Sequence, residues 1–460
     1  MSAQPLAAAG VSRPLRRILG VGFGLAFAFG TMVGVGILRL PGMVAAAAGT
    51  RALILVCWCV GGLYALAGAV SVSELAVMYP EAGGFRVYAR HAFGELAGFI
   101  VGWVDWLASV ATLAYGAVAA TEFAATLWPP LAGYQSAVAI AVLGAFTVLH
   151  SAGLKMGRTV TTVVSTTIGA LLLVLIAACF LAAPHLPPAG PGAVAEGPVR
   201  ILSLGGLLAL VPAIRAILTA YDGWYAPIYT AEECVGASHT LPRSIIGGAL
   251  LVAALYLAIN LALLRVLPIP QLAASKLPVA AAAQIVLPRG SASLITALSI
   301  LIVLSLINST AIMAPRILFS MAREGLLPQK VAAVSRGGTP QVALAASTLT
   351  GAAMILTGSF NQLIALFAVL VLLNYIAAFL AVFALRRRRP EAPRPYRALG
   401  YPVSTLVILA GSVGFLLAAV LEDWRSGVTA LLFLSLCIPA YAAAARSRDA
   451  RMSRPASGAS

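Results

Sequence analysis

Twelve apolar runs recur from one end of this 460-residue chain to the other, each of a length that can cross a lipid bilayer. A spanning helix needs about 20 residues, and only helices and closed barrels satisfy their backbone hydrogen bonds inside lipid. The runs therefore predict an all-α integral membrane protein with twelve transmembrane helices. Their approximate limits are 19–46, 52–79, 96–128, 133–150, 159–183, 201–232, 244–266, 292–322, 341–357, 361–385, 402–421 and 427–445.

The composition agrees with a lipid bilayer as the main surroundings. Hydrophobic residues make up 61% of the chain and charged residues 10%, whereas a soluble domain carries about a quarter charged residues. The connections between the apolar runs are short, so none of them can form a separate soluble domain.

The net charge of +16 raises the question of a nucleic-acid partner, so the positions of Lys and Arg matter. If the N-terminus is cytoplasmic, 21 of the 30 Lys and Arg residues fall on that side, six on the other and three within runs. Cytoplasmic loops of membrane proteins carry such an excess. We therefore predict a multi-pass protein with both termini in the cytoplasm and no nucleic-acid partner. Because no organellar targeting segment is apparent, we expect a plasma membrane, the inner membrane of a bacterium.

Residue patterns typical of enzymes are missing from the sequence. The four histidines show no metal-ligand spacing, and we find neither a phosphate loop nor a nucleophile constellation. Cys57 and Cys59 are too close for a framework disulfide. We expect no catalytic activity, no cofactor and no metal site.

The stretch GTMVGVGILRLPG, residues 30–42, interrupts the first apolar run. Glycine weakens a helix by about 1 kcal/mol relative to alanine, and proline removes a backbone donor. Inside a membrane, unwound backbone is tolerated only where protein, water or a ligand satisfies it. A break would offer helix N–H groups to a carboxylate and carbonyls to an ammonium. Alternatively, Gly30, Gly34 and Gly36 are small residues that let two helices pack closely.

A second interrupted run, LLALVPAIRAILTAYDGWYAPIYTAEE, favours the first interpretation. It holds Pro212, Pro227 and a polar patch at residues 221–224, and it is the sixth run. Paired broken helices at the start of two five-span halves indicate an inverted-repeat transporter with a binding site near the membrane midplane. The organisation that we predict is a cytoplasmic N-terminal segment, two five-helix repeats, two additional helices and a basic cytoplasmic tail, at 1–18, 19–183, 201–385, 402–445 and 446–460.

Five stretches resemble the amino acid–polyamine–organocation superfamily, especially its L-type and bacterial amino acid permeases. In chain order they are GTMVGVGIL, SELAVMYPEAGGFRVYARHAFGELAGFIVGW, TAYDGWYAPIYTAEE with LPRSI after it, NSTAIMAPRILFSMAREGLLP, and ALRRRRPEAPRPYRALGYP. The resemblance implies the leucine-transporter-type fold, a 5+5 inverted repeat with broken first and sixth helices plus two extra helices. It also implies transport by alternating access.

The resemblance further implies which residues contact the substrate. The substrate carboxylate would meet backbone N–H groups of Val35, Gly36 and Ile37, with Met32 and Gly34 alongside. The substrate ammonium would meet carbonyls at both breaks, and those of the sixth span belong to Thr219, Ala220 and Tyr221.

Asp222 is an ionisable residue inside a predicted span, and such residues default to functional hypotheses. Its carboxylate could carry a proton or attract a cationic substrate. The alternative that we favour is a cap on the short helix after the break.

The coupling of transport stays open between sodium, protons and pure exchange. Many relatives carry a lysine in the fifth span, but this chain has Thr166 and Thr167 nearest to that place. Sodium needs carbonyls and hydroxyls, which Thr167 and, on the eighth span, Ser305, Ser309 and Thr310 could supply. These hydroxyls could equally bond the carbonyl one helical turn back. Ionisable residues near the cytoplasmic ends are expected to form gate salt bridges, namely Glu74, Arg316, Arg323 and Glu324.

The function that follows is secondary active transport of amino acids across the plasma membrane, as a permease or an exchanger. The partners are then a small amino acid, the lipid bilayer, and a coupling ion (proton or sodium) or a counter-substrate. A polyamine or organic amine transporter is one alternative, which Asp222 favours and the carboxylate-receptive break opposes. A sensor that binds amino acids without transporting them is another, but no appended signalling domain is visible.

Overall fold

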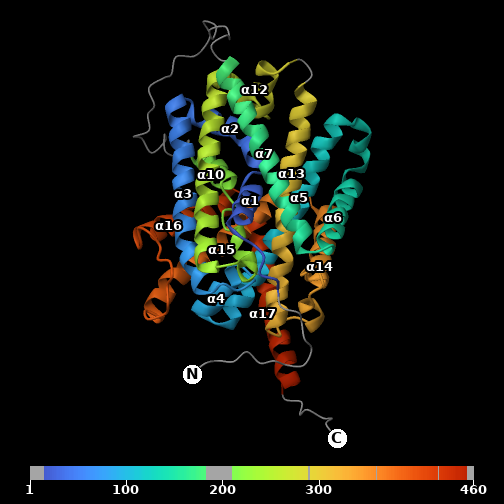
Figure 1. The fold of residues 1–460 in the computed structure, drawn as a ribbon, viewed down its shortest axis with the longest axis vertical. Coiled ribbons are helices and arrows are strands. Elements are labelled where there is room, and N and C mark those ends of the chain that lie inside the picture. Colours follow the sequence, from blue (N-terminus) through green and yellow to red (C-terminus); the bar gives the residue numbers. More distant parts are fainter. Residues whose placement is uncertain (1–14, 183–209, 289–290, 359, 423, 453–460) are drawn as a thin grey trace.

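The structure, a computed structural model, describes residues 15–182, 210–288, 291–358, 360–422 and 424–452. In this part of the chain the elements are helical, apart from one isolated bridge between Leu19 and Cys234. Figure 1 shows the helices as a bundle of long rods. The α-helices are α1 Val21–Met32, α2 Val35–Ala48, α3 Arg51–Met78, α4 Phe85–Phe93, α5 Glu95–Leu127, α6 Gln135–Ser151, α7 Leu154–Ala182, α9 Val211–Ala220, α10 Ala237–Val266, α11 Ile269–Ala274, α12 Pro278–Val286, α13 Ser291–Arg323, α14 Gln341–Thr357, α15 Phe360–Arg388, α16 Val403–Glu422 and α17 Trp424–Met452; the 3₁₀ helices are η1 Pro129–Tyr134, η3 Ala226–Glu233 and η4 Gln329–Ala332.

The described residues contain nine helices long and apolar enough to cross a membrane, or ten if the bent pair α1 and α2 forms one span. This confirms an all-helical, multi-pass membrane protein. Two of the twelve predicted spans are not among the ten. One is α14, which has 17 residues, and the other is the sixth run, of which residues 201–209 lie outside the described residues. The twelve-helix arrangement stays a prediction.

The first predicted span is broken where the glycines predicted a break. Helix α1 ends at Met32, α2 begins at Val35, and the two axes differ by 50°. Gly34 precedes α2 in an extended conformation. At its other end, α2 stops at Gly49, whose φ of +70° is a left-handed conformation that glycine adopts at little cost.

The most buried spans are α5 and α13, which pack against each other at the centre of the bundle. Helix α15 packs along α5, and α1 lies against α10, α7 and α13. Few residues of helices α6, α16 and α17 are buried. The broken α1–α2 pair therefore sits inside a shell of unbroken helices, where protein can satisfy its open backbone.

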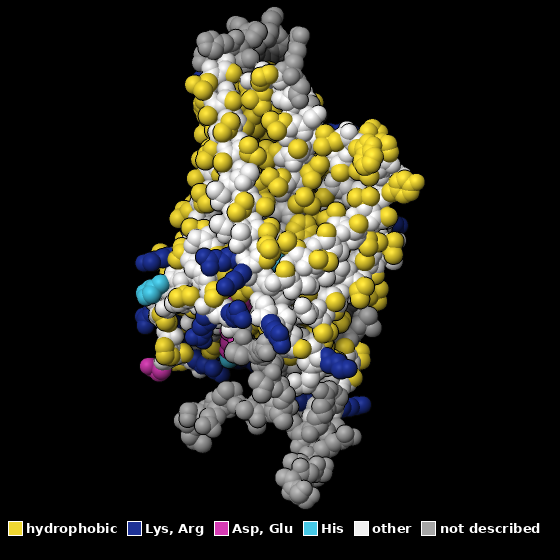
Figure 2. Space-filling view, turned by 45° about the vertical axis from the view of Figure 1, so that its right-hand side comes forward, with side chains coloured by type: hydrophobic (Ala, Val, Ile, Leu, Met, Phe, Trp, Pro, Cys, Tyr) yellow, Lys and Arg dark blue, Asp and Glu magenta, His cyan; other side chains and the backbone are white. Residues whose placement is uncertain are grey.

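The surface divides into an apolar region and a basic end. Figure 2 shows hydrophobic side chains over the upper and middle part and Lys and Arg gathered towards the lower end, which holds α4 in Figure 1. Long apolar side chains such as Leu173 and Val174 on α7 are more than half exposed. An exposed apolar region of this size is expected where lipid replaces water.

Candidate functional site

A cavity of about 560 Å³ opens at the break between α1 and α2. Its walls come from both predicted breaks and from α5, α13, α15 and α16. Of the residues predicted to contact the substrate, six line it: Met32, Gly34, Val35, Gly36, Thr219 and Asp222. The structure thus brings together residues about 190 positions apart in the sequence.

The two breaks touch each other through glycines. A Cβ atom on Gly36 would lie 3.0 Å from the Cα of Ala220, so α2 and α9 approach closely there. A Cβ atom on Gly223 would lie 2.9 Å from the carbonyl carbon of Thr31, and Gly223 has a φ of +107°. Gly36 therefore combines both interpretations of the first break, since it lines the cavity and permits close packing.

The start of α2 presents N–H groups to the cavity. Gly34 gives α2 no side-chain cap, and the first N–H groups of any helix lack helical partners. Val35 and Gly36 line the cavity, whereas the side chain of Ile37 is fully buried and is not among the lining residues. These N–H groups carry the positive partial charge of a helix start, which suits a carboxylate.

At the end of α9, Thr219 is the one residue of the three predicted carbonyl ligands that lines the cavity. Helix α9 ends at Ala220, and the chain turns at residues 221–225 before η3 begins. Ala220 and Tyr221 do not line the cavity: Ala220 packs on Gly36, and the Tyr221 hydroxyl donates to the carbonyl of Trp58 at 3.0 Å. At the first break, the carbonyl of Met32 accepts a 2.8 Å bond from the Tyr256 hydroxyl.

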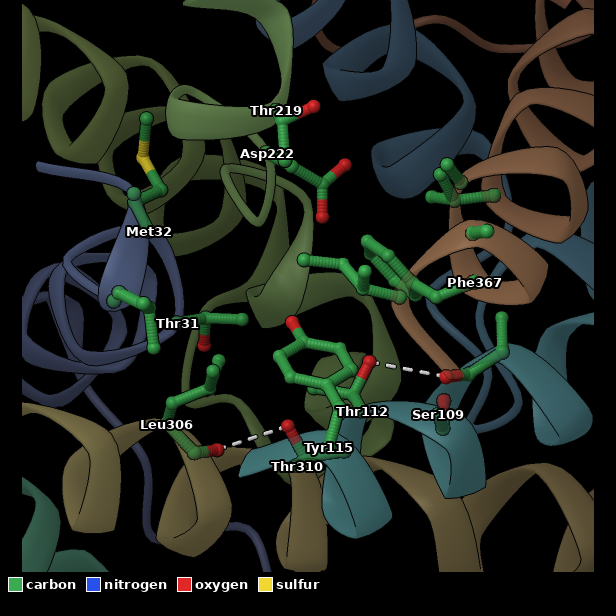
Figure 3. A pocket seen from close by; sticks show the side chains of 18 of the residues that line it. Thr31, Met32, Ser109, Thr112, Tyr115, Thr219, Asp222, Leu306, Thr310 and Phe367 are labelled. Atoms are coloured by element: carbon green, nitrogen blue, oxygen red, sulfur yellow. Dashed lines mark hydrogen bonds between the residues drawn. The ribbon is translucent and has the colours of Figure 1, made fainter. Parts of the chain in front are cut away.

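Asp222 points into the cavity (Figure 3). Its two carboxylate oxygens accept hydrogen bonds from the hydroxyls of Tyr225, at 3.2 Å, and Tyr375. Within the described residues no backbone N–H donates to it, and η3 has no side-chain cap. The predicted helix cap is therefore wrong. The donors to this carboxylate are the hydroxyls of Tyr225, just before η3, and Tyr375 on α15, and not the N–H groups of a helix.

One face of α5 contributes polar groups, of which the sequence-based site did not include Asp105, Ser109 and Thr112. Asp105, Ser109 and Thr112 line the cavity at spacings of four and three residues, which places them on one helical face. Tyr115 lies on the same wall, and its ring packs against Phe367 at 5.7 Å. This hydroxyl periodicity was visible in the sequence.

Asp105 ties α5 to two other elements. Its Oδ1 accepts hydrogen bonds from the hydroxyl of Tyr229 at 2.7 Å and from the amide of Asn374 at 3.3 Å. The partner Asn374 lies on α15 and Tyr229 on η3. Asp105 and Asp222 thus each bind one residue of the η3 region and one of α15, so the base of the cavity is linked to both elements.

A separate hydroxyl cluster surrounds Gly30 in α1. A Cβ atom on Gly30 would lie 2.8 to 3.0 Å from the hydroxyl oxygens of Ser165, Ser305 and Ser309. Ser165 donates to the carbonyl of Ala26, while the hydroxyls of Ser305 and Ser309 are buried without a partner in the described part of the chain. Glycine at position 30 leaves the space that a side chain would fill.

The two threonines predicted to belong to this ion site lie elsewhere. Thr167 is exposed on α7, two residues beyond Ser165, so its side chain faces away from the cluster. Thr310 lines the main cavity and donates to the carbonyl of Leu306 at 2.9 Å. The hydroxyl that α7 contributes is therefore that of Ser165.

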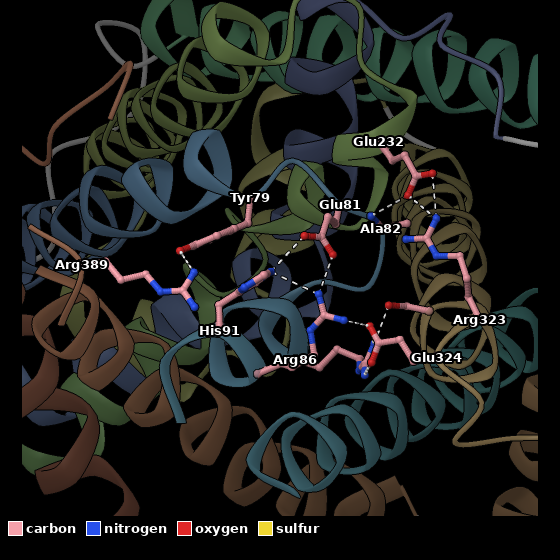
Figure 4. A network of polar contacts seen from close by, with 11 residues as sticks. Tyr79, Glu81, Ala82, Arg86, His91, Glu232, Arg323, Glu324 and Arg389 are labelled. Atoms are coloured by element: carbon pink, nitrogen blue, oxygen red, sulfur yellow. Dashed lines mark hydrogen bonds and ion pairs between the residues drawn. The ribbon is translucent and has the colours of Figure 1, made fainter. Parts of the chain in front are cut away.

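An ion-pair network closes the bundle at the basic end (Figure 4). Arg86 on α4 bonds both oxygens of Glu324 and the hydroxyl of Ser320, and Arg90 also pairs with Glu324. Arg86 is fully buried, so its charge has to be compensated by these bonds and not by water. Helices α4 and α13 are thereby joined.

The remaining expected gate residues are also paired. Arg316 binds Glu233 through two nitrogens at 2.8 and 3.0 Å, and Arg323 binds Glu232 at 2.8 Å. Glu74 accepts from Arg386 and Arg394. The predicted salt bridges of Glu74, Arg316, Arg323 and Glu324 are all present.

Glu81 joins the same network from the loop before α4. It accepts from His91 and Arg90, each at 2.9 Å. Burial alone raises the pKa of this carboxyl. The hydrogen bond from His91 and the charges of Arg90, His91 and Arg323 lower the pKa by more than burial raises it, so it lies below its ordinary value. The network therefore stabilises the ionised form of Glu81.

Comparison with known proteins places this architecture in a family. Residues 24–437 match the family described as "Amino acid permease". The chain is 28% identical over 440 residues to the serine/threonine exchanger SteT of Bacillus subtilis, covering 93% of this chain and 96% of that protein. It is 25% identical to the b(0,+)-type amino acid transporter 1 of Mus musculus (92% and 86% covered) and 26% identical to the branched-chain amino acid permease BcaP of Bacillus subtilis (86% and 87% covered).

Proposed function

The chain belongs to the amino acid permease family and is an amino acid transporter of the membrane, and from this premise we propose that its substrate binds in the cavity between the two breaks. The observation that carries the proposal is the contact of the start of α2 with the end of α9 along one cavity. In this proposal, N–H groups at the start of α2 and carbonyls at the end of α9 provide the donors and acceptors that a zwitterion requires.

In this proposal the substrate carboxylate binds the N–H groups of Val35, Gly36 and Ile37, with Met32 and Gly34 beside it. The ammonium binds carbonyls of Thr219, Ala220 and Tyr221, and the charge of Asp222 reinforces them. The side chain of the substrate extends towards the hydroxyls of α5. Support comes from the lining of the cavity by both breaks.

A competition experiment tests this mode of binding. Purified protein in proteoliposomes is offered a labelled amino acid together with its ester or its decarboxylated amine. Neither analogue should compete, because each lacks one of the two charged groups. Equal competition by putrescine would favour the polyamine alternative instead, which the two cavity carboxylates Asp105 and Asp222 make worth testing.

We further propose alternating access in a 5+5 inverted repeat, with repeats at 19–183 and 201–385, two added helices at 402–445, a cytoplasmic segment at 1–18 and a cytoplasmic tail at 446–460. The membrane is the plasma membrane of a bacterium, with both termini inside. Conformational exchange and not bond chemistry then sets the rate, so the protein is no enzyme. The closed ion-pair network at the basic end supports an inner gate.

For coupling, we propose that the hydroxyls of Ser305 and Ser309 can hold a sodium ion, with Thr167 and Thr310 outside that group. Their lack of partners in the described residues supports such a site. Exchange with internal substrate is the second candidate, since the relative SteT is named an exchanger. Uptake measured with and without sodium, a pH gradient or internal substrate separates these, and binding without any flux would indicate a sensor.

A further inference from the structure

A second groove, of about 410 Å³, lies on the outer side of α7, apart from the transport cavity. It is lined by Ile18, Lys155, Arg158, Thr159, Thr162 and Val163. Both cations lie in the first turns of α7, where this span enters the apolar part of the molecule. The groove thus sits at the boundary between the basic end and the lipid-facing surface.

The groove carries positive charge that the described protein does not balance. None of the ion pairs formed by the described residues includes Lys155 or Arg158. Two further cations are close by: the Arg16 side chain reaches Gly338 next to Leu154, and Arg336 precedes Gly337, whose carbonyl accepts from the N–H of Leu154.

The sequence near these cations supplies no carboxylate. The three stretches that supply these cations contain no Asp or Glu over residues 1–73, 123–195 and 325–390. An anionic ligand would neutralise charges that these stretches leave without a carboxylate.

The donors that face the groove are cationic. Thr159 and Thr162 donate their hydroxyl protons to the carbonyls of Lys155 and Arg158 one turn back. Arg158 uses one nitrogen to bond the carbonyl of Ile18 at 3.2 Å, which leaves the rest of its guanidinium donors. An ammonium beside a guanidinium suits a phosphate group.

The surroundings favour a lipid as the source of that phosphate. Val163 is 57% exposed at the apolar edge of the groove, and Leu173 and Val174 continue the exposed apolar surface along α7. Acyl chains can lie along this surface while the phosphate stays at the level of Lys155 and Arg158. Basic pockets beside transmembrane helices are known lipid headgroup sites.

We propose that this groove binds the phosphate of an anionic phospholipid and thereby holds the segment before α1 against α7. The segment is also bonded to the inner gate, since the N–H of Leu19 donates to the carbonyl of Glu233 at 3.0 Å, and Glu233 pairs with Arg316. A lipid bound at Arg158 and Ile18 therefore stabilises the conformation in which the Glu233–Arg316 ion pair is formed.

The test uses the full-length protein in nanodiscs of phosphatidylcholine, with or without phosphatidylglycerol. Phosphatidylglycerol should raise the melting temperature of the wild type by several degrees, and this rise should be mostly lost in Lys155→Gln/Arg158→Gln. Arg387→Gln/Arg397→Gln removes two exposed cations at the basic end outside the groove and is the matched control, which should keep the rise. An equal rise in the groove variant, or an equal loss in the control, overturns the proposal.

Two further measurements test the proposal even if the double variant does not fold. Native mass spectrometry should find fewer tightly bound phosphatidylglycerol molecules on Lys155→Gln than on the wild type, and Lys155→Arg should restore them. Inorganic phosphate added to phosphatidylcholine nanodiscs should leave the melting temperature unchanged. Unaltered lipid retention by Lys155→Gln, or stabilisation by inorganic phosphate equal to that by the lipid, contradicts a lipid site.

Discussion

Asp222 places a carboxylate in the cavity at the α1–α2 break, two residues beyond the end of α9. Two tyrosine hydroxyls hold it, one from Tyr225 and one from Tyr375. These hydroxyl donors hold the carboxylate in place, and because they are neutral they do not cancel its negative charge. In the proposed mode of binding that charge adds to the carbonyls that face the substrate ammonium, and charge-assisted hydrogen bonds are about twice as strong as neutral ones.

We predict that Asp222→Asn raises the KM for amino acid uptake about tenfold, equivalent to about 1.4 kcal/mol. Asparagine keeps the size of the side chain and can still accept from a tyrosine, but it lacks the charge. The measurement is the concentration dependence of uptake into proteoliposomes. Tyr225→Phe, which removes one donor and keeps the charge, should change KM less. An Asn variant with unchanged KM that no longer responds to a pH gradient would make Asp222 a proton carrier.

The glycines of the first break differ in the room that surrounds them. A Cβ atom at Gly34 would meet only Leu306, at 3.5 Å, an ordinary contact, whereas at Gly36 it would press on the backbone of Ala220 at 3.0 Å. We therefore expect Gly36→Ala to destabilise the protein by about 1–3 kcal/mol and Gly34→Ala to stay within about 0.5 kcal/mol. Thermal unfolding in detergent without substrate measures both. Equal losses would show that α2 and α9 are not in close contact.

At the scale of elements, the short helix α4 connects the loop after α3 to the end of α13. Arg86 and Arg90 lie on it and bind Glu324, while Glu81 in the loop binds Arg90 and His91. Gly84 has a φ of +66°, and a Cβ atom there would overlap the ring of Tyr229 at 2.2 Å. The loop thus packs directly on η3, so movement of α4 must disturb η3 and the cavity base.

We predict a pH-dependent contribution from Glu81. Because the folded protein lowers the pKa of this carboxyl, its ionised form stabilises the fold above the ordinary carboxyl pKa of about 4.3, and this stabilisation is lost as the pH falls below it. Wild type should therefore melt higher than Glu81→Gln at pH 7, with the gap closing towards about pH 3.

The control for Glu81 is Glu391→Gln, which removes an exposed carboxylate in the loop between α15 and α16. Its melting temperature should follow that of the wild type at each pH. A gap between wild type and Glu81→Gln that stays constant from pH 7 to acid conditions would argue against ionisation as the source of the effect.

The first break could be predicted from the local sequence, but the hydrogen-bond partners of Asp222 could not. Gly34 acts through its own backbone, so its effect could be read from a few residues. Tyr375 lies 153 positions from Asp222, and no nearby residue marks it as a donor. The capping prediction failed for this reason. Ser165 was missed in favour of Thr167 because a shift of two residues changes the helical face.

At the scale of the whole molecule, composition and run length predicted the helical membrane class, because lipid permits few other backbones. The cavity could not be predicted in the same way, since its walls come from seven helices whose contacts depend on packing between distant segments. Charge distribution adds one more prediction for the whole chain, its orientation in the membrane, because cytoplasmic loops carry an excess of Lys and Arg.

The proposed orientation predicts opposite accessibility for two exposed residues. Lys276 lies in the connection between α11 and α12, and Arg397 in the loop between α15 and α16. In a variant without native cysteines, Lys276→Cys should react with a membrane-impermeant maleimide in intact cells, and Arg397→Cys only after the membrane is permeabilised. In the proposed orientation the end with the excess of cationic loops is cytoplasmic, so the two sites are expected to differ. The reverse pattern would place the ion-pair network at the outer face and make it an outer gate.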